Sequence, residues 1–267
     1  MSMLNLEKKI DILNHNFNKV KDKVSVIPHI YELLNDDIFQ FLVEKSCNNI
    51  SLSEEEDIIF NELYEFLYNN EIIGLLTKEE AKVLYSLAQQ SKEKQEPAIE
   101  IGTHLGFSTI FVAKSKFVYA VDNQFDNKLA SEYPTFRHWF KIFYDNSDYL
   151  TRNISDDNTG IDICHKFWGI AGVAENIKTF SQDAIKAVDY MPEASIVFYD
   201  ANHDFDSIYD MDAYFLKVVP GGFFAIHDFN IRTPGVVGAT YDFYKRNKDI
   251  LEGPFLVDSL IWFKKKD

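Results

Sequence analysis

The sequence predicts an α/β fold, in which a doubly wound, mostly parallel sheet of seven strands follows an N-terminal helical cap. Short apolar runs alternate along the chain with segments of helical periodicity, which is typical of parallel strands whose connecting helices cover both faces of a sheet. Most of these runs end in acidic or polar residues, as expected where a buried strand reaches the edge of its sheet. The predicted strands are residues 97–100, 117–121, 177–180, 194–199 and 223–226, followed by a closing hairpin of 255–257 and 260–264.

The N-terminal region, residues 1–92, is predicted to be helical. From Leu4 to about Cys47 apolar residues recur at three- and four-residue steps, and two later helices open with capping boxes, Ser53 to Glu56 and Thr77 to Glu80. We interpret these helices as a structural cap on the main domain, residues 93–267. The alternative is a contact between subunits of a homo-oligomer, or a lid over a pocket.

A glycine-containing turn follows the first strand. The stretch from Glu100 to Ser108 predicts strand, turn and helix, and Ser108 with Thr109 opens the helix. Its glycines let a ligand approach the backbone, and the helix N-terminus offers free N–H groups. The spacing differs from the Gly-x-Gly-x-x-Gly of dinucleotide-binding proteins, so the turn indicates a nucleotide pocket without indicating hydride transfer.

Asp122 ends the second strand, about twenty residues beyond the glycine turn. A carboxylate at this place in a doubly wound sheet can accept hydrogen bonds from both hydroxyls of a ribose. The alternative is that Asp122 only caps the following turn with Asn123. Together with the preceding turn, the position favours ribose binding.

An insertion of residues 124–176 separates the second and third strands, where a simple crossover needs about a dozen residues. The insertion is predicted to contain a helix that starts near Pro134. A polar stretch follows from Asp145 to Gly160, and a short helix from Ile161 to Ala174 leads back to the sheet. Its aromatic residues either shape a substrate pocket or only pack on one another, and both interpretations stay open. They are Phe125, Tyr133, Phe136, Trp139, Phe140, Phe143 and Tyr144.

The later strands deliver further polar side chains. We expect a helix from Phe205 to Val218, stopped by Pro220-Gly-Gly222, and a helix from Val236 to Asn247 before the hairpin. Because the carboxyl ends of parallel strands meet at one edge, the polar residues at the strand ends are predicted to line one crevice. These residues are Glu100, Asp122, Ser181, Gln182, Asp183, Asp200, His203, His227 and Asp228.

The composition excludes several classes of protein. With 42 acidic and 27 basic side chains, the net charge of −15 disfavours nucleic acid and anionic membrane surfaces as partners. Cys47 and Cys164 stand far apart, so the sequence indicates neither a disulfide framework nor a zinc site. No secretion signal opens the chain and no apolar run is long enough for a membrane helix. We therefore expect a cytoplasmic protein.

In this order and at these separations, the motifs resemble class I S-adenosylmethionine-dependent methyltransferases, of the branch with catechol O-methyltransferase and macrocin-type sugar O-methyltransferases. The resemblance covers roughly Leu75 to the C-terminus. It implies a Rossmann-like methyltransferase fold and O-methylation of a small molecule such as a sugar, phenol or secondary metabolite. It rests on Glu100-x-Gly-x-x-x-Gly-x-Ser108, Asp122, Ser181-Gln-Asp183, Asp200-x-x-His203, Pro220-Gly-Gly222 and His227-Asp228.

The resemblance also implies how S-adenosylmethionine is bound. Glu100 would anchor the glycine loop, Ser108 would lie near the methionine carboxylate, and Asp122 would hold the ribose. Asp200 would face the sulfonium and the amino group. The methionine part would lie against Gly102, Thr103, His104 and Gly106, and the adenine against Ser181, Gln182 and Asp183.

His203 stands where related enzymes carry a general base. Histidine titrates near neutrality, which suits removal of a proton from the attacking hydroxyl. The alternative is a histidine at a helix start, bonded to Asp200 or Asp206. His227 is expected to be a structural residue at the strand end.

The resemblance leaves a magnesium site open. Asp200 and Asp228 match the acidic metal ligands of metal-using relatives, but Phe229, at the next position, cannot ligate a cation. Without a metal, Asp228 would orient His203 or the acceptor hydroxyl. Other chemistries on the same sheet are a relative of the cephalosporin hydroxylase group and a nicotinamide enzyme. A non-catalytic partner subunit is the alternative from another class.

Overall fold

The structure, a computed structural model, describes residues 52–72, 74–128, 155, 157–230 and 232–267. Several predictions fall outside these residues. They are the helices from Leu4 to Cys47 with their proposed subunit contact, the helix near Pro134, and most of the aromatic and polar parts of the insertion.

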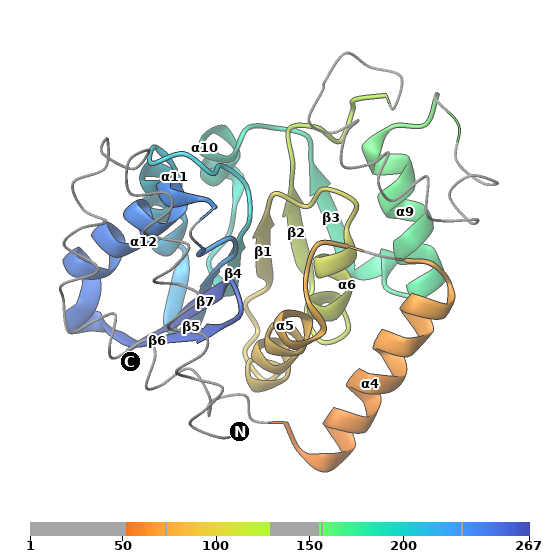
Figure 1. Ribbon diagram of the computed structural model, residues 1–267, viewed down its shortest axis with the longest axis horizontal. Helices are drawn as coiled ribbons and strands as arrows, with labels where there is room; N and C mark the ends of the chain where they lie inside the picture. Colours follow the sequence, from red (N-terminus) through yellow and green to blue (C-terminus); the bar gives the residue numbers. More distant parts are fainter. Residues whose placement is uncertain (1–51, 73, 129–154, 156, 231) are drawn as a thin grey trace.

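The described residues form a sheet of seven strands in the order β3-β2-β1-β4-β5-β7-β6 (Figure 1). Pairing is parallel from β3 to β5, and only β7 runs antiparallel to its neighbours β5 and β6. The predicted fold class is therefore confirmed. The strands are β1 (Ala98–Ile101), β2 (Val118–Val121), β3 (Ile177–Phe180), β4 (Ala194–Tyr199), β5 (Val218–Ile226), β6 (Leu251–Val257) and β7 (Leu260–Lys265).

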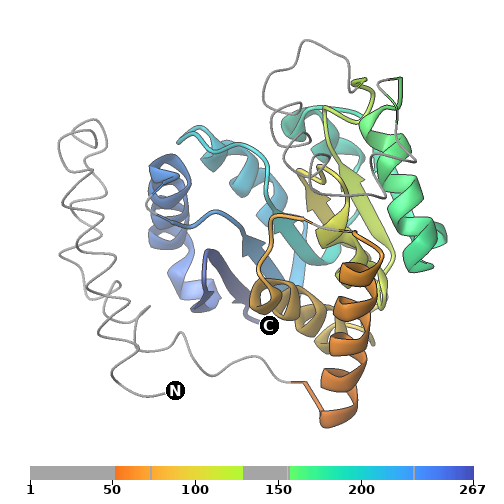
Figure 2. The same ribbon diagram turned by 45° about the vertical axis from the view of Figure 1, so that its right-hand side comes forward.

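Helices cover both faces of this sheet (Figure 2). One layer consists of α4 (Glu54–Asn69), α5 (Lys78–Gln90), α6 (Phe107–Ala113) and α9 (Gly160–Ala171), and the other of α10 (Ala184–Ala187), α11 (Ser207–Phe215) and α12 (Pro234–Asn247). The described part of the chain also contains the short 3-10 helices η1 (Ala174–Asn176), η2 (Val188–Tyr190) and η3 (Lys248–Ile250). None of the described helices combines the length and the apolar character that a membrane span requires.

Strand β4 shows why the sheet is buried on both faces. Its apolar side chains alternate, so that Ile196 and Phe198 join the core under α5 and α6, while Val197 and Tyr199 join the core under α11 and α12. The N-terminal helices share the first of these cores. The ring of Phe60 in α4 lies 5.8 Å from that of Phe111 in α6, measured between centroids.

The predicted helix starts are confirmed for α4 and α5. The side chains of Ser53 and Thr77 each accept a hydrogen bond from the backbone N–H three residues on, and their own backbone N–H groups donate to the carboxylates of Glu56 and Glu80, as a capping box requires. Helix α6 starts differently from the prediction. Its first residue is Phe107, and Gly106 caps it in the left-handed region rather than a side chain of the Ser108-Thr109 pair.

The predicted helix from Phe205 to Val218 was wrong at its end. Helix α11 ends at Phe215, and Pro220-Gly-Gly222 lies within β5 instead of stopping a helix. Val218 pairs with Ala194, whereas the next pair joins Phe223 to Ile196, so the residues between them bulge out of the ladder. Proline is tolerated at such a bulge because no ladder partner needs its missing N–H.

Candidate active site

A cavity of about 990 Å³ opens at the carboxyl ends of the parallel strands. Strands β1 and β4 are neighbours, and the chain leaves them toward opposite edges of the sheet. Such a switch point is where open α/β sheets bind ligands. Of the residues predicted to line a crevice or bind a cofactor, Gly102, His104, Asp122, Gln182, Asp183, Asp200, His203, His227 and Asp228 line the cavity.

The other predicted residues do not line the cavity: Glu100, Thr103, Gly106 and Ser108 are buried, and Ser181 is exposed. Glu100 is 2% exposed, and its carboxylate accepts hydrogen bonds from the hydroxyls of Ser108 and Thr109. Thr103 donates to the same carboxylate at 3.4 Å. Burial outweighs these bonds and raises the pKa of Glu100 to about 8. Glu100 therefore ties the glycine loop to α6.

Ser181, after β3, is bonded within the protein: its hydroxyl donates a hydrogen bond to Asp126 at 2.5 Å.

The two loop glycines are required by contacts within the protein. Gly102 has φ +86°, and a Cβ there would lie 1.9 Å from the carbonyl oxygen of Asp200. Gly106 has φ +77°, and a Cβ there would lie 2.4 Å from Nε1 of Trp168, which donates to the Gly106 carbonyl. The close approach of β1 to β4 thus depends on Gly102, and the packing of α9 on the loop depends on Gly106.

Asp122 is oriented by the glycine loop. Its Oδ2 accepts a hydrogen bond from the backbone N–H of His104 at 2.7 Å, and its Oδ1 accepts one from that of Gln124 at 2.7 Å. The carboxylate therefore caps the turn and also faces the cavity, so the two interpretations of the sequence are compatible. Burial raises its pKa. Burial also lowers the pKa of His104 to about 4, so this histidine is neutral at pH 7.

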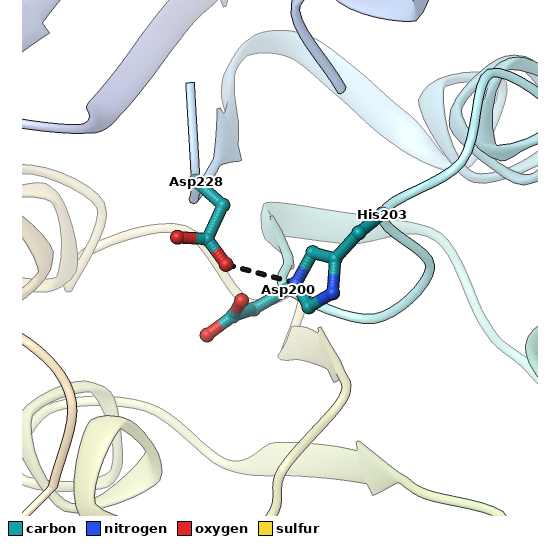
Figure 3. Close-up of side chains that lie close together, drawn as sticks. All are labelled: Asp200, His203 and Asp228. Atoms are coloured by element: carbon teal, nitrogen blue, oxygen red, sulfur yellow. Dashed lines mark ion pairs between the residues drawn. The ribbon is translucent and has the colours of Figure 1, made fainter. Parts of the chain in front are cut away.

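His203 and Asp228 form a hydrogen-bonded pair above Asp200 (Figure 3). The distance between Nε2 of His203 and Oδ2 of Asp228 is 2.8 Å, and the imidazole is about half exposed to the cavity. The bond to Asp228 raises the pKa of His203. Because Nε2 faces the carboxylate, the lone pair of the neutral imidazole lies on Nδ1. The partner is thus Asp228, not the Asp200 or Asp206 of the alternative interpretation.

His227 lies buried among three carboxylates. Its Nδ1 is 3.2 Å from Oδ1 of Asp200 and 3.8 Å from Oδ1 of Asp228, and its Nε2 is 3.5 Å from Oε2 of Glu80. Burial lowers the pKa of His227, but the carboxylates outweigh it and raise the pKa to about 11. Burial likewise raises the pKa of Glu80, and the contact with His227 outweighs it and lowers the pKa to about 2. The pair is therefore ionised at neutral pH.

Glu80 is a site residue that the sequence analysis did not predict. Its place in a capping box is a sufficient local explanation for a glutamate at the start of α5. A signal was present nevertheless, since Glu80 lies four residues before Leu84 and seven before Leu87 on the apolar face of the helix. A charged residue on such a face must find a buried partner.

The donor atoms at the centre of the cavity fit a magnesium ion only in part. One ligand atom each of Asp200, His203 and Asp228 lies within 4.8 Å of the others. The two carboxylates suit a hard cation, whereas an imidazole suits a transition metal. The side chain of Phe229 packs against Val237 and Tyr241 and provides no further ligand.

Comparisons with known proteins support the fold. No protein-family model matches the sequence, and no curated protein matches it. Among solved structures, the O-methyltransferase NovP is 12% identical with a TM-score of 0.51, and the match covers 80% of this chain and 98% of that one. A putative caffeoyl-CoA O-methyltransferase from Staphylococcus aureus is 14% identical with a TM-score of 0.49, covering 80% and 100%. An O-methyltransferase from Bacillus cereus in complex with SAH is 14% identical with a TM-score of 0.48, covering 85% and 97%.

At 12% identity, the likeness to NovP concerns the fold alone. The match to NovP includes nearly the whole of that chain, and the strand order agrees with the doubly wound sheet predicted from the sequence. The protein thus has the Rossmann-like fold of the class I methyltransferases.

Proposed function

We propose that the protein is an S-adenosylmethionine-dependent methyltransferase that methylates a hydroxyl group of a small molecule. The observation that supports the proposal is the set of side chains that line one cavity. Asp122, oriented by the glycine loop, and the His203–Asp228 pair face the same space from the carboxyl ends of β2, β4 and β5. The first arrangement suits a nucleoside, and the second suits removal of a proton.

Each group has a defined role in this proposal. When bound, S-adenosylmethionine supplies a methyl group on a sulfonium, which is transferred by displacement at carbon. Asp122 accepts the ribose hydroxyls, and Gln182 with Asp183 faces the adenine. Gly102 keeps the loop close to β4, so that Asp200 faces the charged methionine end. These contacts hold the donor in line with the attacking oxygen.

His203 removes the proton of the acceptor. Nδ1 of the neutral imidazole accepts the hydroxyl proton as the acceptor oxygen bonds to the methyl carbon, and the bond from that carbon to sulfur would break to leave S-adenosylhomocysteine. The positive charge that develops on the ring is stabilised by Asp228 at 2.8 Å. Asp200 and Asp228 are also the residues that would hold a divalent cation, but no step of this scheme depends on one.

Calorimetric titration tests the proposal most directly. We expect S-adenosylhomocysteine to bind with micromolar affinity or better, and NAD to bind far more weakly, because Asp122 serves either ribose but the loop lacks the dinucleotide spacing. Repeating the titration with magnesium chloride and with a chelator measures any contribution of a metal. Tight binding of NAD without binding of S-adenosylhomocysteine would favour the nicotinamide enzyme. Binding of neither would favour the non-catalytic subunit.

The charge of the cavity favours an acceptor without negative charge. Among the described lining residues, Arg232 and the ionised His227 are cationic, against seven carboxylates: Glu80, Asp122, Asp183, Asp200, Asp210, Asp228 and Asp258. Even at an effective dielectric constant of about 20, a unit charge 4 Å from another contributes about 4 kcal/mol. An acceptor with a phosphate or carboxylate group would therefore be repelled.

Matched acceptors check this expectation. Dopamine, catechol and protocatechuate carry the same pair of hydroxyls with a cationic, a neutral and an anionic substituent, and glucosamine, glucose and glucuronate form an equivalent set of sugars. In the set that is methylated, we expect the anionic member to react at least about tenfold more slowly than the cationic one. The difference should shrink at high ionic strength. Faster reaction of the anionic member would contradict the charge argument.

A further inference from the structure

We propose that Glu80, a residue of helix α5 outside the strand-end motifs, is a positioning residue that fixes Asp200 and Asp228 in the active site. The inference rests on the proposed function. In that function Asp200 faces the methionine end of the cofactor and Asp228 pairs with the base His203, and Glu80 would hold both carboxylates in place. Glu80 acts through its neighbours and touches neither the cofactor nor the acceptor in this proposal.

The capping role of Glu80 does not explain its burial. Three capping boxes occur in the described residues, closed by Glu56, Glu80 and Asp162. Asp162 is exposed and the side chain of Glu56 is 24% exposed, whereas that of Glu80 is 2% exposed. Capping a helix requires no such burial, and taking a carboxylate out of water costs free energy unless partners replace the water. The partners of Glu80 therefore define its further role.

One set of partners leads to Asp200. Oε2 of Glu80 lies 3.5 Å from Nε2 of His227, and Nδ1 on the opposite side of the ring lies 3.2 Å from Oδ1 of Asp200. The imidazole is thus held between two carboxylates and cannot turn without losing one of them. Its orientation determines where the Asp200 carboxylate lies. Because the ring is rigid, a displacement of Glu80 would displace His227 and, with it, the Asp200 carboxylate in the cavity.

A second set of partners leads to Asp228. Oε1 of Glu80 accepts hydrogen bonds from the backbone N–H and the hydroxyl of Ser259, at 2.8 and 2.7 Å. The carbonyl of Ser259 accepts a hydrogen bond from the N–H of Phe229 at 2.8 Å. Phe229 follows Asp228, which has φ +59°, a left-handed conformation that is uncommon for L-residues, although aspartate adopts it more often than most. Glu80 therefore supports the turn that presents Asp228 to His203.

The test measures binding of S-adenosylhomocysteine by calorimetry to the full chain and to three variants. Glu80→Ala removes all of these contacts, and Glu80→Gln keeps an acceptor for Ser259 but removes the charge that faces His227. Glu79→Gln is the matched control, because it removes the same charge from the same turn of α5 at an exposed position. We expect Glu80→Ala to weaken binding about tenfold, Glu80→Gln to weaken it less, and Glu79→Gln to leave it unchanged.

The outcomes separate positioning from a purely structural role. A lower melting temperature of Glu80→Ala or Glu80→Gln with unchanged affinity of the folded protein would overturn the proposal, as would an equal loss in Glu79→Gln. If the unaltered chain does not bind S-adenosylhomocysteine, the proposed function fails. Crystal structures of the unaltered chain and of Glu80→Gln then test the positioning itself. A contact between His227 and Asp200 that stays at its present length in the variant would overturn it, and a lost contact would support it.

Discussion

Replacement of His203 by alanine is expected to slow methyl transfer by about a hundredfold or more while leaving the affinity for S-adenosylhomocysteine nearly unchanged. The imidazole is the one side chain of the His203–Asp228 pair that can accept a proton at neutral pH, and it is half exposed to the cavity. It lies on the loop after β4, and none of the cofactor contacts proposed above is assigned to it. Initial rates at saturating S-adenosylmethionine, compared with calorimetric affinities, measure the two effects separately.

Asp228→Asn provides the control for this role. The bond to Asp228 raises the pKa of His203. As the pH falls, the imidazole therefore becomes protonated, and stops acting as a base, at a higher pH than an ordinary histidine, whose pKa is about 6.5. Activity should fall as the pH drops through this raised pKa, and the fall should move to lower pH in Asp228→Asn. Full activity of His203→Ala would exclude the histidine as the base, whatever the pH profile.

Gly102→Ala is expected to abolish binding of S-adenosylhomocysteine, with a loss of at least about a hundredfold. The added Cβ would lie 1.9 Å from the carbonyl oxygen of Asp200, which belongs to the backbone and cannot rotate away. The residue would also have to keep φ +86° or change the course of the loop. Either response moves β1 away from β4 at the point where Asp122 and Asp200 face the cavity.

Gly172→Ala is the control that separates the effect of backbone strain from the effect of steric overlap between the added Cβ and its neighbours. Gly172 also has a positive φ, +67°, but no heavy atom lies within 4 Å of its added Cβ. This variant should lose only about 1–2 kcal/mol of stability through the left-handed backbone and bind S-adenosylhomocysteine normally. Thermal unfolding and calorimetry of both variants give the comparison. Normal binding by Gly102→Ala, or an equal loss of binding in Gly172→Ala, would refute the role given to the loop.

The strand ends were predictable because their signal is local. An apolar run that stops at Asp122 or Asp200 marks both a buried strand and the edge at which it ends, and parallel pairing brings such edges together. The chain segment around Pro220 was not predictable in this way. Its proline and glycines are compatible with a helix end and with a β-bulge, and only the pairing of Val218 with Ala194 selects the bulge.

The class of fold, the order of the described helices and strands from Glu54 onward, and most of the polar residues around the cavity follow from the sequence, because hydrophobic periodicity and strand ends are properties of neighbouring residues. The tertiary structure alone decided which partner each of these residues has. His203 pairs with Asp228 rather than Asp206, and Glu80 contacts His227 from a helix nearly 150 residues away, 227 − 80 = 147. Contacts of such separation depend on the packing of whole layers, which no local pattern encodes.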